Sequence, residues 1–226
     1  MSFESYHHFC PVAKACELIE PRWSLLVLCE MWNGYTRFND IRRGIPAMSP
    51  TLLSTRLKQM EKNGLVRRDV NGATGEIQYR TTPLADGLSP IVKALGDWAH
   101  RNVDAAVCLE EVDVRILMWN LRRKVNTAVL PRHRKSVIQF IFPELPDAER
   151  NYWILGRPGE PADICMIDPG HDVDLYVTAD ALALASAWIG HSTLQAEMAR
   201  EKIVLTGDAL LMNSIGDWMV RSSFAA

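Results

Sequence analysis

Hydroxyl and lysine side chains recur along one side of a short helical pattern, PTLLSTRLKQMEK, at residues 50–62. At about 100° per residue, the residues that share this side are Thr51, Thr55, Lys58 and Lys62. No acidic residue lies at its centre. Hydroxyl and ammonium groups can bond to base edges and to phosphates, so the pattern favours a helix that lies against nucleic acid. An ordinary solvated surface helix is the alternative.

The opposite side of the same pattern is a narrow apolar stripe. Leu53, Leu57 and Met60 fall within about 60° of one another, which suits a helix held on a small core. A coiled coil would need a sustained heptad repeat, whereas this pattern stops at Gly64. Arg56 flanks the stripe, where it could contact a phosphate or form an ion pair with a neighbouring helix.

The flanking sequence predicts the elements that position this helix. Helices are expected before it at residues 11–19, 21–34 and 37–45. Ser49 is the expected N-cap, with Pro50 at the first helical position. After the helix, LVRRDV and EIQYRTT flank the glycine-rich turn NGATG and predict a hairpin. Compact helices followed by a hairpin form a winged helix-turn-helix arrangement.

We predict that this arrangement binds double-stranded DNA. In helix-turn-helix proteins, the N-terminal residues of the second helix meet the bases. The turn of the hairpin is short and has no basic residue at its tip, so a phosphate contact there would use Thr74 or backbone N–H groups. The candidate DNA-contacting residues are Arg37, Ser49, Pro50, Thr51, Ser54, Thr55, Arg56, Lys58, Lys62 and Thr74.

A single heptad seam follows the hairpin, within PLADGLSPIVKALGDWAHRNV. Its members, which recur at +4, +3, +4 and +3, are Leu84, Leu88, Ile91, Leu95 and Trp98. Seams of this kind usually pack against another helix. Pro90 lies inside the run and predicts a kink or a break there.

The second half of the chain predicts an α+β domain. A helix at about residues 112–126 precedes four predicted strands, SVIQFIF, NYWILG, ADICMID and VDLYVTA. Ile138, Phe140 and Phe142 alternate as in a half-buried strand. The helical runs ADALALASAWIG and STLQAEMAR, the strand KIVLTG and a last helix, DALLMNSIGDWMV, complete the domain. Strands before helices favour a mostly antiparallel sheet covered by helices. The expected fold class is α+β, with domains at 1–103 and 104–226.

Composition and charge are those of a globular protein with two unlike halves. The 226-residue chain is 48% hydrophobic and 23% charged. It has no apolar run of 18 residues and no charged-then-apolar start, so we expect a soluble, cytoplasmic protein that engages no membrane. Residues 1–103 hold 13 Lys and Arg against 10 Asp and Glu, and the remainder holds 12 against 17. This asymmetry suits a DNA-facing module joined to one that is not.

Neither catalysis nor metal binding is expected. The five cysteines are widely spaced and form no CxxC pair, which argues against a disulfide framework and a zinc site. His171 lies near Asp168, Asp172 and Asp174, but Asp-Pro-Gly-His is first of all a turn. The sequence has no nucleophile elbow, no phosphate-binding glycine loop and no HExxH. We therefore predict a protein that is not an enzyme and uses no metal or cofactor.

Five motifs run from about Cys10 to Val103. They are the Cys-Pro start, the Trp in RWSLLVL, the run RFNDIRRGIP, the run LSTRLKQMEKNGLVRR and the junction YRTTPLADGL. Together they resemble the HxlR-type winged-helix transcription regulators. The resemblance implies a homodimer in which terminal helices form the interface and the fourth helix enters the major groove. The seam at 84–98 is then expected to be part of the dimer contact.

Cys10 precedes the proline that starts the first helix, with His7 and His8 beside it. A helix N-terminus and nearby positive charge would stabilise its thiolate. The resemblance adds a role, because some HxlR-type proteins use a cysteine at this position as a thiol or electrophile sensor. A buried, inert cysteine is the alternative. The other cysteines, at 16, 29, 108 and 165, sit in apolar contexts and are expected in cores.

A second resemblance covers roughly residues 112–220. The Asp-Pro-Gly turn leading into VDLYVTAD, the run AWIGHSTLQAEMAREKIVLTGD and a final helix are similar to those of sterol-carrier-type lipid-binding domains. The resemblance implies an apolar cavity between sheet and helices, and a small apolar ligand. The alternative is that the apolar residues fill a core and the domain only mediates oligomerisation, giving a dimer or a tetramer.

The leading hypothesis is a homodimeric, sequence-specific DNA-binding transcription regulator. Its activity would be modulated by a small apolar effector in the C-terminal domain or by the thiol of Cys10. The alternative is a lipid-binding or carrier protein whose winged helix serves only for dimerisation.

Overall fold

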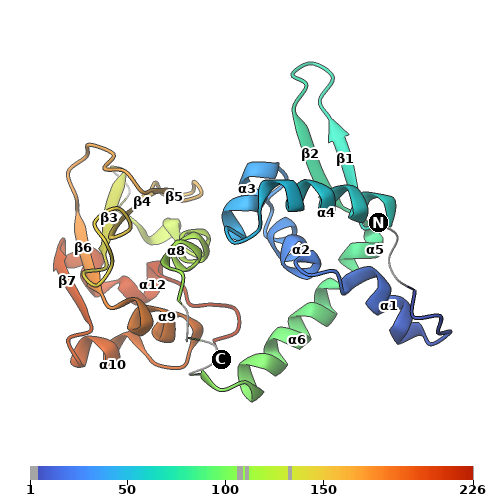
Figure 1. The fold of residues 1–226 in the computed structure, drawn as a ribbon. Helices are drawn as coiled ribbons and strands as arrows, with labels where there is room; N and C mark the ends of the chain where they lie inside the picture. Colours follow the sequence, from blue (N-terminus) through green and yellow to red (C-terminus); the bar gives the residue numbers. More distant parts are fainter. Residues whose placement is uncertain (1–4, 106–108, 110–111, 132–133, 226) are drawn as a thin grey trace. The chain divides into compact units, whose positions relative to one another are not determined.

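The computed structural model describes residues 5–105, 109, 112–131 and 134–225, so Cys108 lies outside the described residues. The chain forms two compact units, Met1–Trp98 and Ala99–Ala226 (Figure 1). The first holds helices and a two-stranded hairpin, and the second holds a five-stranded sheet with helices. The predicted α+β class is therefore observed.

The N-terminal unit is a winged helix-turn-helix, as the sequence predicts. Its elements are α1 (Pro11–Ile19), α2 (Ser24–Trp32), α3 (Phe38–Gly44), α4 (Pro50–Lys62), β1 (Val66–Val70), β2 (Ile77–Thr81), α5 (Pro83–Asp86) and the part of α6 (Ser89–Asn102) up to Trp98. The hairpin is antiparallel and pairs Val66 with Thr81. The N–H of Tyr79 donates to the carbonyl of Thr36 at 2.7 Å, which ties β2 to the segment before α3.

Helix α4 begins and ends where the sequence predicts. The Oγ of Ser49 accepts the N–H of Leu52 at 3.2 Å, and Pro50 occupies the first helical position. This bond satisfies one of the N–H groups that a helix start leaves without a partner. The helix ends at Lys62, and Gly64 adopts a φ of 72°, which a side chain would disfavour.

The apolar stripe of α4 is buried as predicted. Leu53 and Leu57 are 0% exposed and Met60 is 2% exposed. They share a core with Leu28 of α2 and Ile41 of α3. Because burying each such side chain contributes about 1.5–3 kcal/mol, the stripe fixes α4 on these two helices and leaves the other side of α4 exposed.

The helix predicted after the hairpin is broken, as Pro90 indicates. Helix α5 stops at Asp86 and α6 begins at Ser89. Leu88, between them, packs against the core of its own unit. The other members of the seam are exposed, namely Leu84 (57%), Ile91 (62%), Leu95 (52%) and Trp98 (54%). The seam therefore consists of four exposed side chains and one that faces inward.

The C-terminal unit is built on a sheet with strand order β5-β4-β3-β6-β7. Its strands are β3 (Ser136–Ile141), β4 (Asn151–Gly156), β5 (Asp163–Cys165), β6 (Leu175–Ala179) and β7 (Ile203–Gly207). Neighbouring strands are antiparallel, except that β3 and β6 are parallel. The helices are α8 (Val114–Arg123), α9 (Ala181–Ile189), α10 (Leu194–Ala199), α11 (Ala209–Asn213) and α12 (Ile215–Trp218), with a short 3-10 helix at Thr127–Val129.

Strand β3 departs from its half-buried prediction. Ile138 and Phe140 face the main core, as the alternation indicates. Val137, on the other face, is also buried, at 3% exposed, because it packs against Trp153 and Leu155 of β4. Alternation in one strand does not reveal a neighbouring strand that also carries apolar residues on the second face.

The prediction of one continuous last helix is also wrong. The run DALLMNSIGDWMV forms two short helices, α11 and α12, that meet at Ser214. The hydroxyl of Ser214 donates to the carbonyl of Leu210 at 2.7 Å. Side-chain bonds of this kind compete with the continuing backbone ladder of a helix.

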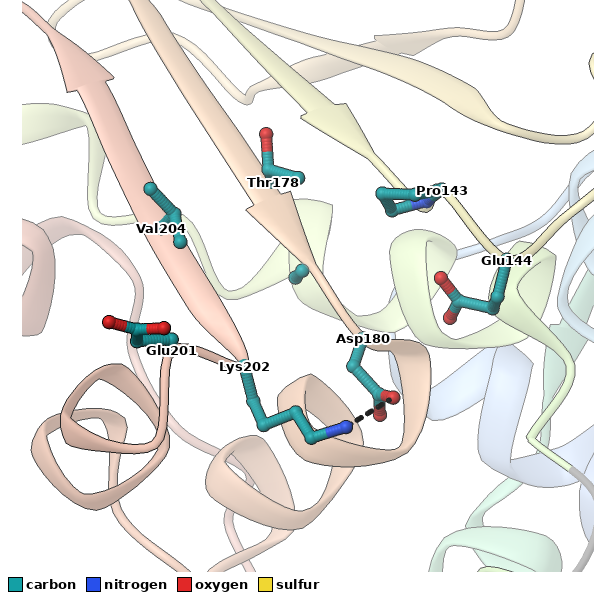
Figure 2. Close-up of a pocket in the computed structure, with 8 residues that line it drawn as sticks. Pro143, Glu144, Thr178, Asp180, Glu201, Lys202 and Val204 are labelled. Atoms are coloured by element: carbon teal, nitrogen blue, oxygen red, sulfur yellow. Dashed lines mark ion pairs between the residues drawn. The ribbon is translucent and has the colours of Figure 1, made fainter.

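The main core of this unit lies between the sheet and the helices. It includes Phe140 and Val177 from the sheet and Leu184 and Trp218 from the helices. The opposite face of the sheet keeps Tyr176 and Val204 exposed. A shallow hollow on that face is lined by Glu144, Thr178, Asp180, Glu201, Lys202 and Val204, among others (Figure 2).

Candidate nucleic-acid interface

The outward side of α4 presents the predicted polar residues to solvent. Thr51, Thr55, Lys58 and Lys62 are exposed, as are Ser49 and Pro50 at the helix start, and Ser54 is half-buried. The structure therefore gathers seven of the ten predicted residues on one helix surface, opposite the buried stripe. Helix α4 has hydroxyls at its N-terminal end and lysines farther along. Hydroxyls can donate to or accept from base edges, and lysines can donate to phosphates.

Two hydroxyls on this helix are oriented by backbone bonds. The hydroxyl of Thr55 donates to the carbonyl of Thr51 at 3.0 Å, so its oxygen remains as an acceptor. Ser49 does the reverse, because its oxygen accepts the cap bond from Leu52 and its O–H remains a donor. A donor at the helix start and an acceptor one turn later are thus both directed by the fold of α4.

Arg56 bonds to its own helix, and its two expected roles stay predictions. Its Nη1 donates to the Oε1 of Gln59 at 2.8 Å, one turn farther along the same helix. Burial lowers the pKa of its guanidinium. Among the described residues its buried Nε has no hydrogen-bond partner. The side chain therefore lies along α4, beside the stripe, instead of extending outward.

Arg37 is placed by the start of α3 and held by the hairpin. It is the N-cap residue of α3, and its Nε forms an ion pair with the Oε1 of Glu76, which directly precedes β2. Arg37 is 61% exposed. A phosphate would therefore compete with a carboxylate for this guanidinium, which sequence reasoning did not foresee.

The turn of the hairpin uses most of the groups that Thr74 could offer. The Oδ1 of Asn71 accepts the N–H groups of Ala73 at 2.9 Å and Thr74 at 3.3 Å. The hydroxyl oxygen of Thr74 accepts the N–H of Glu76 at 3.3 Å. Its own O–H remains as the group that could donate to a phosphate.

The structure adds basic residues that the sequence argument missed. Arg67 of β1 lies opposite Arg80 of β2. Both guanidiniums approach Asp69, at 3.4 and 3.3 Å, so two positive charges share one carboxylate on one face of the hairpin. The tip of the hairpin has no basic residue, whereas Arg67 and Arg80 lie on its strands. Only the register of the hairpin brings these two residues opposite each other.

Cys10 lies at the N-cap of α1 and is half-buried. Its N–H donates to the Nδ1 of His8 at 2.9 Å, and no side-chain bond caps the helix. Cys16 and Cys29 are also half-buried, and Cys165 packs on the far face of the sheet. The core prediction is confirmed in part, because Cys165 packs against the small core of Val137, Trp153 and Leu155 but none of the three cysteines is fully buried.

Comparisons with known proteins place the N-terminal region in a family. The family model described as HxlR-like helix-turn-helix matches residues 18–107. YvaP of Bacillus subtilis (strain 168), an HTH-type transcriptional regulator, is 36% identical over 97 residues, which are 42% of this chain and 90% of that protein. The chain belongs to the HxlR-like helix-turn-helix family. YtfH of Escherichia coli (strain K12), another HTH-type transcriptional regulator, is 29% identical over 103 residues, covering 45% of this chain and 82% of that protein.

A solved structure, the redox regulator HypR in its oxidised form, is 30% identical and covers 42% of this chain and 99% of that chain, with a TM-score of 0.39. As an HxlR-like protein, the chain is a DNA-binding transcription regulator, and its relatives are regulators rather than enzymes. The structure of the C-terminal unit lies almost wholly beyond the matched region. Within the described residues, no helix is long and apolar enough to cross a membrane.

Proposed function

We propose that the chain is a homodimeric, sequence-specific transcription regulator in which α4 of each copy lies in a major groove. The observation that carries this proposal is the two-sided helix α4, with its apolar stripe fully buried and its hydroxyls and lysines exposed. Ser49, Thr51 and Thr55 are the proposed base-reading residues, because they lie at the N-terminal end of the recognition helix. Lys58 and Lys62 are proposed phosphate contacts.

The proposed dimer contact is the exposed part of the seam on α5 and α6. Its members are large apolar side chains that are each more than half exposed, namely Leu84, Ile91, Leu95 and Trp98. Leu88 is left out of this contact because it packs on the unit's core. A two-fold dimer would place the two α4 helices about 34 Å apart, one turn of DNA, on a pseudo-palindromic site.

The double variant Thr55→Ala/Lys58→Ala tests the DNA-reading role. We expect DNA affinity to fall about tenfold or more and the slope of log affinity against log salt to shrink by about 0.9, because one base contact and one phosphate contact are lost. Fluorescence anisotropy with the protein's own upstream DNA measures both. Arg157→Ala, on the C-terminal unit, is the matched loss of positive charge and should change neither.

If the folded double variant binds with unchanged affinity and salt slope, α4 does not read DNA. The chain is then a lipid-binding or carrier protein whose winged helix serves dimerisation.

We further propose that a small apolar molecule bound in the C-terminal unit changes the spacing of the two α4 helices. The support for this is the resemblance to sterol-carrier-type domains. The hollow in Figure 2 carries Glu144, Asp180, Glu201 and Lys202, so its rim is too charged to be the apolar site. To shift the spacing, the ligand must bind one arrangement more tightly than the other. Native mass spectrometry after expression tests for a co-purified apolar molecule, and its absence from every preparation would contradict the proposal.

Cys10 is the proposed point of thiol control. It lies at the N-cap of α1, a helix that has no buried residue and whose Val12 is 69% exposed. A modified Cys10 would change how α1 meets a second copy. Cys10→Ser should remove the response of DNA binding to oxidant, with Cys29→Ser as the matched control. An unchanged response in Cys10→Ser would leave Cys10 a structural residue.

A further inference from the structure

Strand β7 forms one edge of the five-stranded sheet, and its own five residues include none of the types that usually protect an edge strand. Its sequence, IVLTG, contains no charged residue and no proline. Natural edge strands are normally shielded by lysines, prolines, bulges or covering segments, because their free backbone groups would otherwise pair with another chain. Val204 and Thr206 are exposed on the face of the sheet away from the helices. Figure 2 shows Val204 projecting there beside Thr178 of β6.

The backbone groups that face outward from β7 follow from its pairing with β6. The N–H of Asp180 donates to the carbonyl of Lys202 at 2.9 Å, and the N–H of Asp208 donates to the carbonyl of Asp174 at 2.8 Å. Hydrogen-bonded pairs alternate along an antiparallel ladder. The residues that bond inward to β6 are therefore Val204 and Thr206. The residues whose backbone groups face outward are Ile203, Leu205 and Gly207.

The outward groups of β7 are open within the part of the chain that the structure describes. Leu205 faces Val177 of β6 in a pair without hydrogen bonds, and no other described residue bonds to its N–H or carbonyl. The N–H and the carbonyl of such a residue point in the same direction from the strand. A second antiparallel strand can form a reciprocal pair of hydrogen bonds with them. Leu205 is the centre of such a site.

A second copy of β7 matches this edge in register and in charge. Antiparallel pairing centred on Leu205 places Val204 opposite Thr206 of the second copy, a pair of β-branched residues of the kind that stabilises adjoining strands. The same register places Lys202 opposite Asp208 of the second copy at both ends. Lys202 is 56% exposed and its pair with Asp180 is long, at 3.5 Å, so its charge remains accessible (Figure 2). Asp208 is 25% exposed, and its Oδ2 is 3.2 Å from the Nη2 of Arg134, so Lys202 of a second copy would share this carboxylate with Arg134.

We propose that β7 pairs with β7 of a second copy around a two-fold axis at Leu205, so that one sheet continues through both C-terminal units. The interface is isologous, because the same edge serves both copies. It is separate from the proposed contact at α6 and does not depend on DNA reading. The C-terminal unit is thereby an oligomerisation module of defined register.

Disulfide trapping in the full-length chain tests the register. A Val204→Cys chain and a Thr206→Cys chain are co-expressed and mildly oxidised, with each variant alone and the unchanged chain as controls. Residues opposite each other in a pair that is not hydrogen-bonded have Cα atoms about 4.5 Å apart, within reach of a disulfide. We expect a covalent two-chain product from the co-expressed pair, and several-fold less from any control. Equal cross-linking in a single variant, or none in the pair, overturns the proposal.

A charge exchange at the same two positions provides an independent measurement. Val204→Lys/Thr206→Lys puts like charges opposite each other twice, and should raise the concentration at which the assembly dissociates about tenfold. Val204→Lys/Thr206→Glu puts opposite charges there and should restore assembly. Both positions are exposed, so circular dichroism should show an unchanged fold. Sedimentation that does not distinguish the two double variants overturns the proposal. DNA affinity of α4 variants is measured separately, so failure here leaves the DNA-binding proposal standing.

Discussion

At the scale of single residues, the ion pair between Arg37 and Glu76 bears on the proposed phosphate contact of Arg37. Arg37 is an expected phosphate contact, yet a carboxylate already neutralises it. Both side chains keep exposed surface, at 61% and 33%, so the pair itself adds little to stability. Its consequence is for binding, because a phosphate must displace Glu76 before it can use Arg37.

Replacing Glu76 by Gln should therefore strengthen DNA binding. The released guanidinium can neutralise a phosphate, so the slope of log affinity against log salt should steepen by about 0.9. A salt series of anisotropy titrations measures it. Glu149→Gln removes the same charge from the C-terminal unit and should leave the slope unchanged. An unchanged slope for Glu76→Gln would mean that Arg37 does not reach the DNA.

At the scale of elements, sequence reasoning succeeds where local chemistry decides. Ser49 caps α4, Pro50 starts it and Gly64 follows it, and each of these signals can be recognised from a few neighbouring residues of the sequence. The stripe of Leu53 and Leu57 follows from helical periodicity alone. A local sequence pattern does not show which distant residues contact each other.

Most of the contacts that escaped prediction join residues that are far apart in the sequence. Arg37 meets Glu76 across the unit, and Arg67 meets Arg80 only through the register of the hairpin. The burial of Val137 on a second face likewise depends on Trp153 in the adjacent strand. In the C-terminal unit the strands are visible in the sequence, but the parallel pairing of β3 with β6 is not.

The exposed seam on α6 yields a prediction for assembly. Leu95→Glu/Trp98→Glu should separate the two copies at this contact, because it places carboxylates in the middle of an apolar interface. Both side chains are more than half exposed, so the fold should be retained. Sedimentation should show weaker assembly, and thermal unfolding should show little change.

Leu88 provides the contrast within the same seam. Since it packs on its own core, Leu88→Ala should leave assembly unchanged and lower the free energy of unfolding by about 1–3 kcal/mol. If Leu95→Glu/Trp98→Glu assembles as strongly as the unchanged chain, the dimer contact lies elsewhere.

At the scale of the whole molecule, two separate cores predict two unfolding transitions. The core of α2, α3 and α4 shares no residue with the core around β3 and β6. A chain of this kind need not unfold in one step.

Two glycines, one in each unit, lie where an added Cβ would clash. A Cβ at Gly44 would meet the Oε2 of Glu30 at 2.0 Å, and one at Gly207 would meet the backbone oxygen of Asp174 at 2.3 Å.

Gly44→Ala should therefore lower the N-terminal transition, and Gly207→Ala the C-terminal one, each by about 1–3 kcal/mol. Denaturant titration followed by circular dichroism separates them. Gly72, where a Cβ would meet nothing within 4 Å, is the control and should move neither transition. A single transition shifted equally by both variants would show that the two cores unfold as one.

If Thr55 reads bases as proposed, the bond from its hydroxyl to the carbonyl of Thr51 also limits which bases of an operator that hydroxyl can recognise. With its proton committed to the helix backbone, the hydroxyl of Thr55 offers only lone pairs to the major groove. The groups that complement lone pairs there are the amino groups of adenine and cytosine, whereas guanine and thymine present acceptors. Selection of binding sites from random DNA should therefore return adenine or cytosine at the step beneath Thr55, and Thr55→Val should abolish that preference.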